Sequence, residues 1–221
     1  MSLSVVNLSQ AANKIEQPFA LVTLGLIGDL SVSLYVCQGQ VDWHKHADED
    51  ELFLVHQGLV KLETERGTVT IHPDECAVVP KGIAHRSGSA LRSVVLLVRA
   101  HVLSERKNGH RRLHATSSDP PLEKGRLSRP ADELPREFEP LTIARVEDVG
   151  LTVQRAKGFG SRTTTPRGGA LLLALRGAAL IETDAGGARL ESGELTLLPG
   201  KAAYTLSAPE EAMVARLQRE M

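Results

Sequence analysis

The chain has 221 residues, of which 42% are hydrophobic and 24% charged, and its formal net charge is −1. The apolar fraction excludes wholesale disorder, and the balance of 26 basic and 27 acidic side chains argues against general nucleic-acid binding. The length allows one or two domains, either of which buries a core without disulfide bonds.

Cysteine usage and the N-terminal segment indicate a cytoplasmic protein. Two cysteines, Cys37 and Cys76, are too few for a disulfide framework and are expected to be reduced. The N-terminal segment has no basic region followed by an apolar run, and no stretch of about 18 apolar residues predicts a membrane span. All eight histidines lie at or before His114, so histidine chemistry belongs to the first half.

Short apolar or alternating runs, separated by Gly, Pro or Asp, fill most of the chain. Such runs, rich in Val, Ile, Leu and Thr, predict an antiparallel sandwich or barrel rather than helices. In the first half they occupy residues 19–26, 31–38, 51–57, 59–65, 68–72, 75–80 and 91–99. In the second half they occupy residues 151–156, 170–176, 178–184, 194–199 and 211–217.

Residues 101–140 interrupt this rhythm with five of the eleven prolines and are interpreted as a linker. On either side of it, adding 119 to a residue number repeatedly reaches a like residue, as with Gly58 and Gly177 or Pro80 and Pro199. The offset needs no insertion, so we infer two copies of one β domain. The expected ranges are 1–100 for the first domain, 101–140 for the linker and 141–221 for the second domain.

The densest cluster of chemically active residues begins at His44. On a strand, His44 and His46 project from one face about 7 Å apart, close enough for both imidazoles to reach one ion. Glu51 opens the next strand, and His85 follows a Pro/Gly turn. Three imidazoles and a carboxylate suit a divalent first-row metal such as Fe, Mn, Ni, Cu or Zn and leave positions open for a substrate.

Each part of this cluster also has a plainer interpretation. A His-x-His pair on a strand is often an exposed or hydrogen-bonded pair, and the acidic residues 48–51 are compatible with a solvated turn. His85 alone is compatible with a loop cap. The combination is more specific than its parts.

The combined pattern resembles the cupin superfamily. The chain reads His44-x-His46-x4-Glu51-x6-Gly58 and then Pro80-x-Gly82-x2-His85, close to the two cupin motifs. The resemblance implies an all-β fold of two tandem cupin-type barrels (double-stranded β-helix, jelly roll). By carry-over it implies His44, His46, Glu51 and His85 as metal ligands. Glu49 and Asp50 compete with Glu51, but only Glu51 stands seven positions before Gly58 as the motif requires.

The same offset predicts that the second barrel has lost its site. The four ligand positions become Thr163, Thr165, Ala170 and Tyr204, which are poor ligands or none at all for a transition metal. We therefore expect one metal in the first barrel and none in the second, whose role is packing. Tyr204 as a pocket residue is the alternative.

Several functions fit this site. The first hypothesis is a metal-dependent enzyme of dioxygenase, isomerase or decarboxylase type acting on a small polar substrate, with Phe53 as a pocket wall or a core residue. The second is a non-catalytic metal-bound module that binds or senses a small molecule. The plainest alternative is that both barrels are structural and the histidines bind no metal. Fused barrels satisfy the contact by which single-domain cupins dimerise, so a monomer and a homodimer are both expected possibilities.

Overall fold

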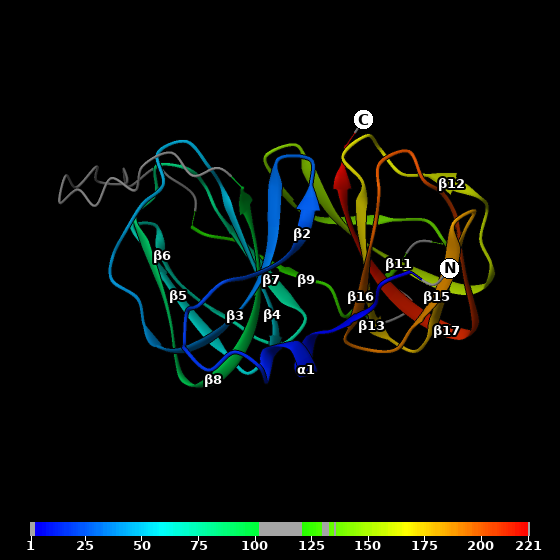
Figure 1. Cartoon of the computed structure of the whole chain (residues 1–221). Coiled ribbons are helices and arrows are strands. Elements are labelled where there is room, and N and C mark those ends of the chain that lie inside the picture. The colour runs from blue at the N-terminus through cyan, green and yellow to red at the C-terminus, as the bar shows by residue number, and fades with distance from the viewer. Residues whose placement is uncertain (1–2, 102–120, 130–132, 135, 221) are drawn as a thin grey trace. The chain divides into compact units, whose positions relative to one another are not determined.

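The computed structural model describes residues 3–101, 121–129, 133–134 and 136–220. Strands dominate these residues, and α1 (Leu8–Ala12) is the one α-helix among them. No helix in these described ranges is long and apolar enough to cross a membrane. The expected all-β fold is confirmed (Figure 1).

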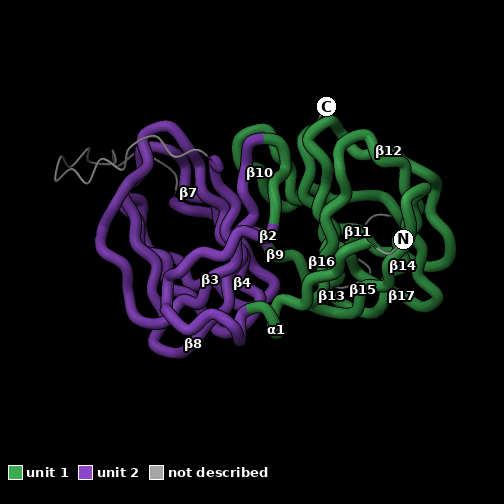
Figure 2. Tube along the Cα trace, in the orientation of Figure 1, with its two compact units in different colours: residues 1–11, 25–28, 126–221 green, residues 12–24, 29–125 purple. Residues whose placement is uncertain are grey.

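The chain divides into two compact units (Figure 2). We call residues 12–24 and 29–125 the first barrel, and residues 1–11, 25–28 and 126–221 the second barrel. Neither unit is continuous in sequence, because residues 1–11 and 25–28 group with the second barrel. Most of the expected linker, at 102–120 and 130–132, lies outside the described residues.

The first barrel is built on one sheet with the strand order β2-β3-β8-β4-β7-β9, and its β5 pairs with β6 and β8. Its strands are β2 (Val22–Ile27), β3 (Leu30–Gln40), β4 (Glu51–Gln57), β5 (Val60–Thr64), β6 (Gly67–Ile71), β7 (Glu75–Val79), β8 (His85–Ala100) and β9 (Lys124–Arg126). Tyr35, Phe53 and Leu97 belong to its buried apolar core. Because successive side chains of a strand point to opposite faces, every second residue of each strand lines this interior.

The second barrel repeats this plan with the order β1-β16-β13-β17-β11-β10, while β12 and β14 pair with β17 and β15 pairs with β14. Its strands are β1 (Val6–Asn7), β10 (Leu141–Val146), β11 (Val149–Phe159), β12 (Thr163–Thr164), β13 (Ala170–Arg176), β14 (Ala179–Thr183), β15 (Gly186–Leu190), β16 (Glu194–Leu198) and β17 (Ala203–Arg219). Each of β2 to β7 recurs 119 residues later with its length unchanged. Even an unusual backbone conformation recurs, since Phe19 and Phe138 both have a φ of 63°.

Each sheet ends in a short strand from an unexpected part of the chain. β1 precedes the first barrel in sequence, yet it pairs with β16 of the second barrel, with Val6 opposite Leu195. β9 immediately precedes the bulk of the second barrel, yet it lies beside β7 in the sheet of the first. The leading strands of the two repeats are therefore exchanged.

Gly58 shows why the histidine motif closes on a glycine. Its φ is 81°, in the left-handed region that other residues rarely adopt, and a Cβ there would collide with the side chain of Ser93. Ser93 Oγ accepts the backbone N–H of Leu59 at 2.9 Å. The turn between β4 and β5 therefore requires glycine, and it fixes where the strand that carries Glu51 ends.

Candidate metal centre

The structure brings the four residues expected as ligands to one place in the first barrel. One nitrogen or oxygen atom from each of His44, His46, Glu51 and His85 lies within 4.8 Å of the others. Glu51 begins β4 and His85 begins β8, while His44 and His46 lie in the segment between β3 and β4. Glu51, His46 and His85 are buried, and His44 is partly exposed.

Backbone hydrogen bonds hold these segments together. His44 and His85 form an antiparallel bridge in which each N–H donates to the other's carbonyl, at 3.0 and 2.8 Å. The carbonyl of His46 accepts the N–H of Gly82 at 2.6 Å. The Pro/Gly turn before β8 therefore does more than place His85, because it also fixes the strand that carries the other two histidines.

Each imidazole is oriented through its Nδ1 atom. His44 Nδ1 lies 2.8 Å from the carbonyl oxygen of Asp42, and His85 Nδ1 lies 3.0 Å from that of Ile83. His46 Nδ1 lies 2.8 Å from Oε1 of Glu49. These oxygens can accept a hydrogen bond from Nδ1, and in that tautomer of the ring Nε2 is the nitrogen left to face a metal. This is the arrangement that metal-bound histidines use in proteins.

Glu51 lies between two of these rings. Its Oε2 is 2.9 Å from Nε2 of His85, and its Oε1 is 3.3 Å from Nε2 of His46. Burial favours the neutral acid, but the adjacent imidazoles of His46 and His85 outweigh burial and hold the pKa of Glu51 well below its ordinary value. Glu51 is therefore an anion at neutral pH.

Burial has the opposite consequence for His44. It disfavours the charged ring, and the neighbouring His85 adds to the effect, so the pKa of His44 falls to about 4. A histidine binds a metal only through a neutral ring, so His44 is ready to act as a ligand at neutral pH.

These residues fit a divalent transition metal. The Nε2 atom of His46 is buried, and its 3.3 Å contact with Oε1 of Glu51 does not have the geometry of a hydrogen bond. The 2.9 Å contact between Nε2 of His85 and Oε2 of Glu51 brings two electron-pair donors together when Nδ1 holds the ring proton. Such a contact is stable only with a proton or a metal ion between the atoms. Three imidazoles and one carboxylate form a mixed N/O site that several divalent ions accept.

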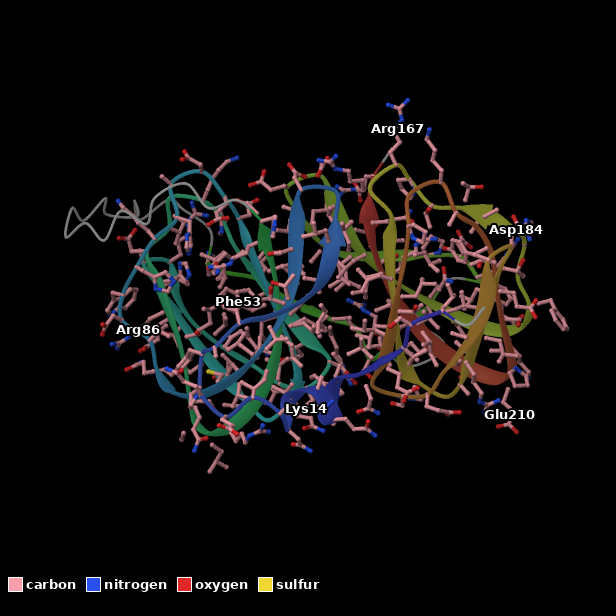
Figure 3. The ribbon with its side chains drawn as sticks, in the orientation of Figure 1. Lys14, Phe53, Arg86, Arg167, Asp184 and Glu210 are labelled. Atoms are coloured by element: carbon pink, nitrogen blue, oxygen red, sulfur yellow. The ribbon has the colours of Figure 1, made fainter. Side chains whose placement is uncertain are left out.

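Apolar and aromatic side chains surround the cluster. The ring of Phe53 is 4% exposed and meets the ring of His85 edge-on, with 6.0 Å between the centroids. Phe53 lies inside the first barrel, whereas Arg86 lies at its edge (Figure 3). The hydroxyl of Tyr35 stays neutral because burial raises its pKa. The predicted position of Phe53 beside the cluster agrees with this arrangement, and its role as a pocket wall stays a prediction.

Sequence reasoning missed two charged residues of this site. Arg99 is 9% exposed and donates from Nη1 to Oε1 of Glu51 at 3.1 Å. It lies near the end of β8, an even number of positions after His85 and Leu97, so all three side chains lie on the same face of the strand. A charged residue on that face of an otherwise apolar run is a signal that could have identified it. Glu49 had been considered only as a rival ligand, yet it contacts His46 from the side opposite Glu51.

The second barrel keeps the geometry of this site without its ligands. Thr163 pairs with Tyr204 across β12 and β17, which is the bridge between His44 and His85 moved by 119 residues. The buried Thr165 donates to the carbonyl of Pro199 at 2.6 Å. Tyr204 is 2% exposed and belongs to the apolar core of this barrel.

Comparisons with known proteins agree with this geometry. Residues 34–97 match the Cupin_2 family of cupin domains. The chain is 34% identical over 93 residues to the uncharacterized protein YdbB of Bacillus subtilis, which corresponds to 42% of this chain and 82% of YdbB. It is 42% identical over 59 residues to homogentisate 1,2-dioxygenase of Rhodopseudomonas palustris, a match that covers 26% of this chain and only 13% of that enzyme.

Solved structures extend the likeness to both barrels. Salicylate 1,2-dioxygenase of Pseudaminobacter salicylatoxidans is 12% identical with a TM-score of 0.74, over 98% of this chain and 84% of that one. Oxalate decarboxylase of Bacillus subtilis, described with Mn(II) centres, is 11% identical with a TM-score of 0.63, over 100% of this chain and 78% of that one. At such identities these structures show the fold alone. With its motifs, its two matching barrels and its relatives, this chain belongs to the cupin family.

Proposed function

We propose that the first barrel binds one divalent transition metal through His44, His46, Glu51 and His85 and is a dioxygenase for a small polar substrate. The observation that carries the proposal is the convergence of these four side chains within 4.8 Å. The likeness of one segment to homogentisate 1,2-dioxygenase supports an oxygenase over an isomerase or a decarboxylase.

In such a site the residues of the first barrel would have separate roles. A bound metal would supply Lewis acidity and open positions for oxygen and substrate. The Nδ1 contacts orient the three rings so that each Nε2 is left for the metal, and Arg99 holds the carboxylate of Glu51 in place at 3.1 Å. The aromatic ring of Phe53 and the core around it exclude water beside His85. A mixed wall of this kind suits a small substrate with an aromatic ring and a polar group.

The test begins with metal content and continues with turnover. We expect the purified protein, after reconstitution with Fe(II), to hold about one metal per chain by elemental analysis, because one group of four side chains that could hold an ion lies in the described part of the first barrel. We expect oxygen uptake with at least one of gentisate, homogentisate, salicylate and catechol. His44→Ala should abolish this uptake and lower the metal content.

The second barrel supplies a matched control. Thr163 occupies the position of His44 in the repeat, so Thr163→Ala removes an equivalent side chain and should leave both metal content and uptake unchanged. Absence of stoichiometric metal in wild type under all reconstitution conditions would disprove the metal site. If the protein held a full complement of metal and bound these compounds but took up no oxygen, the dioxygenase hypothesis would be rejected in favour of the non-catalytic binding module.

A further inference from the structure

The second barrel carries an arginine where the first carries a leucine. Arg216 stands 119 residues after Leu97, which belongs to the buried core of the first barrel. On β17 Arg216 pairs with Leu172 of β13, a fully buried core residue of the second barrel. Because partners in register share a face of the sheet, the side chain of Arg216 faces the interior. The emptied metal position of this barrel therefore lies beside a cation.

The guanidinium of Arg216 is incompletely satisfied. Its Nη1 donates to the hydroxyl of Tyr204 at 3.3 Å, and its Nε is buried without a hydrogen-bond partner. It forms no ion pair with any residue that the structure describes, whereas Arg99 in the first barrel is paired with Glu51. The position equivalent to Glu51 is Ala170, so the repeat has lost the carboxylate. Arg216 is partly exposed, which gives small solutes access to it.

The chemistry around Arg216 and Tyr204 suits a small carboxylate anion. A guanidinium with a buried, unpaired Nε and no counter-ion among the described residues is unfavourable, and its cost falls when an anion with hydrogen-bond acceptors is placed against it. The planar guanidinium matches a carboxylate, which accepts two parallel N–H bonds. Since Arg216 already donates to the oxygen of Tyr204, the tyrosine hydroxyl keeps its own proton to donate. The amide of Gln154, a buried residue in register with Val214, lies on the same interior face.

We propose that the second barrel binds a small carboxylate anion through Arg216 and Tyr204. This site is separate from the proposed metal centre and needs no metal. It gives the barrel without the four histidine and glutamate side chains a binding role of its own, and it accounts for an arginine at the position that the first barrel fills with leucine.

The test uses metal-free full-length protein and titrates benzoate, with the neutral isostere benzamide as the comparison. To remove the first barrel's own arginine from the measurement, calorimetry is repeated in an Arg99→Leu background. We expect benzoate to bind in both backgrounds and benzamide to bind weakly or not at all. Arg216→Leu should weaken benzoate binding by at least about tenfold, because charged hydrogen bonds are lost.

Arg216→Leu also separates binding from structure, because it copies the residue of the first barrel. We expect the melting temperature of this variant without benzoate to equal or exceed that of wild type, and the rise on adding benzoate to disappear. Tyr204→Phe should keep the fold and weaken binding by a smaller factor. Equal benzoate binding by wild type and Arg216→Leu would overturn the proposal, as would a lower melting temperature of Arg216→Leu with no benzoate binding by wild type.

Discussion

Glu49 illustrates how a residue beside a ligand can decide the quality of a metal site. Its Oε1 lies 2.8 Å from Nδ1 of His46, and its side chain is only 6% exposed. A carboxylate in this position raises the basicity of the imidazole and fixes the direction of its Nε2 lone pair. Among the three histidines of the site, His46 is anchored by the carboxyl group of Glu49, whose pKa burial raises, whereas His44 and His85 are anchored by backbone carbonyls.

This difference predicts that Glu49→Gln lowers metal affinity about tenfold while the fold is kept. The reason is the loss of charge at a position that still accepts a hydrogen bond from Nδ1. Competition with a chelator of known affinity measures the effect. The matched control is Asp42→Asn, because His44 uses only the backbone carbonyl of Asp42 and should keep its anchor. A stability loss without an affinity change would show Glu49 to be merely structural.

The depressed pKa of His44 predicts how the metal-free protein responds to acid. Burial and the neighbouring His85 lower the pKa of this histidine from 6.5 to about 4 in the folded protein. Between these values the unfolded chain binds a proton that the folded chain does not, so stability falls as the pH drops from 6.5 toward 4. Above pH 6.5 His44 is neutral in both the folded and the unfolded chain, so it causes no loss of stability there.

Urea denaturation at a series of pH values measures this dependence. Metal-free wild type should lose stability more steeply over that range than His44→Gln, whose amide does not titrate. Parallel curves for the two proteins would contradict the shift. Metal binding should steepen the dependence of wild type further, because protons compete with the ion for the rings.

Among the elements, the exchanged strands have the greatest consequence for stability. β1 gives the edge strand β16 a partner, and Asn7 adds a side-chain hydrogen bond to Glu194. Nearby, Thr196 donates to the carbonyl of Ser4 at 2.7 Å, and Leu3 packs against the apolar core of the second barrel. An unpaired edge strand exposes a row of backbone donors and acceptors, so β1 also protects the sheet from association.

Deletion of residues 1–7 should therefore destabilise the second barrel by about 1–3 kcal/mol through lost hydrogen bonds and apolar burial. Hydrogen exchange measured by mass spectrometry should show faster exchange at β16. β7 is the internal control, because it occupies the same place in the first barrel and keeps β9 as its neighbour. Equal exchange of β16 before and after the deletion would mean that β1 contributes nothing.

At the scale of the whole molecule, the repeat explains what could be predicted from the sequence. Turn residues such as Gly58 and Gly177 recur at a constant offset because both copies need the same backbone conformation there, and the predicted tandem barrels are confirmed. The four expected ligands do lie together, although their binding of a metal stays a prediction. Their spacing is informative because two short motifs determine all four positions.

The remainder depends on contacts that no local pattern encodes. Arg99 reaches Glu51 across 48 positions of the chain, and its partner becomes evident only when β8 is placed beside β4. β1 has two residues and β9 has three, too few for any alternation of polar and apolar side chains. The exchange of these strands follows from which sheet edges remain open after folding, and not from their own composition.

The exchange also fixes the order in which a growing chain can complete its parts. The first barrel has all its strands once residue 126 has been synthesised, so it can close before the rest of the second barrel has been made. Glu194, the partner of Asn7, lies 187 residues later, so at about 5–20 residues per second the first strand stays without its partner for roughly 10 to 40 seconds. A strand that is synthesised before the first barrel therefore finds its partner only after most of the second barrel has been made.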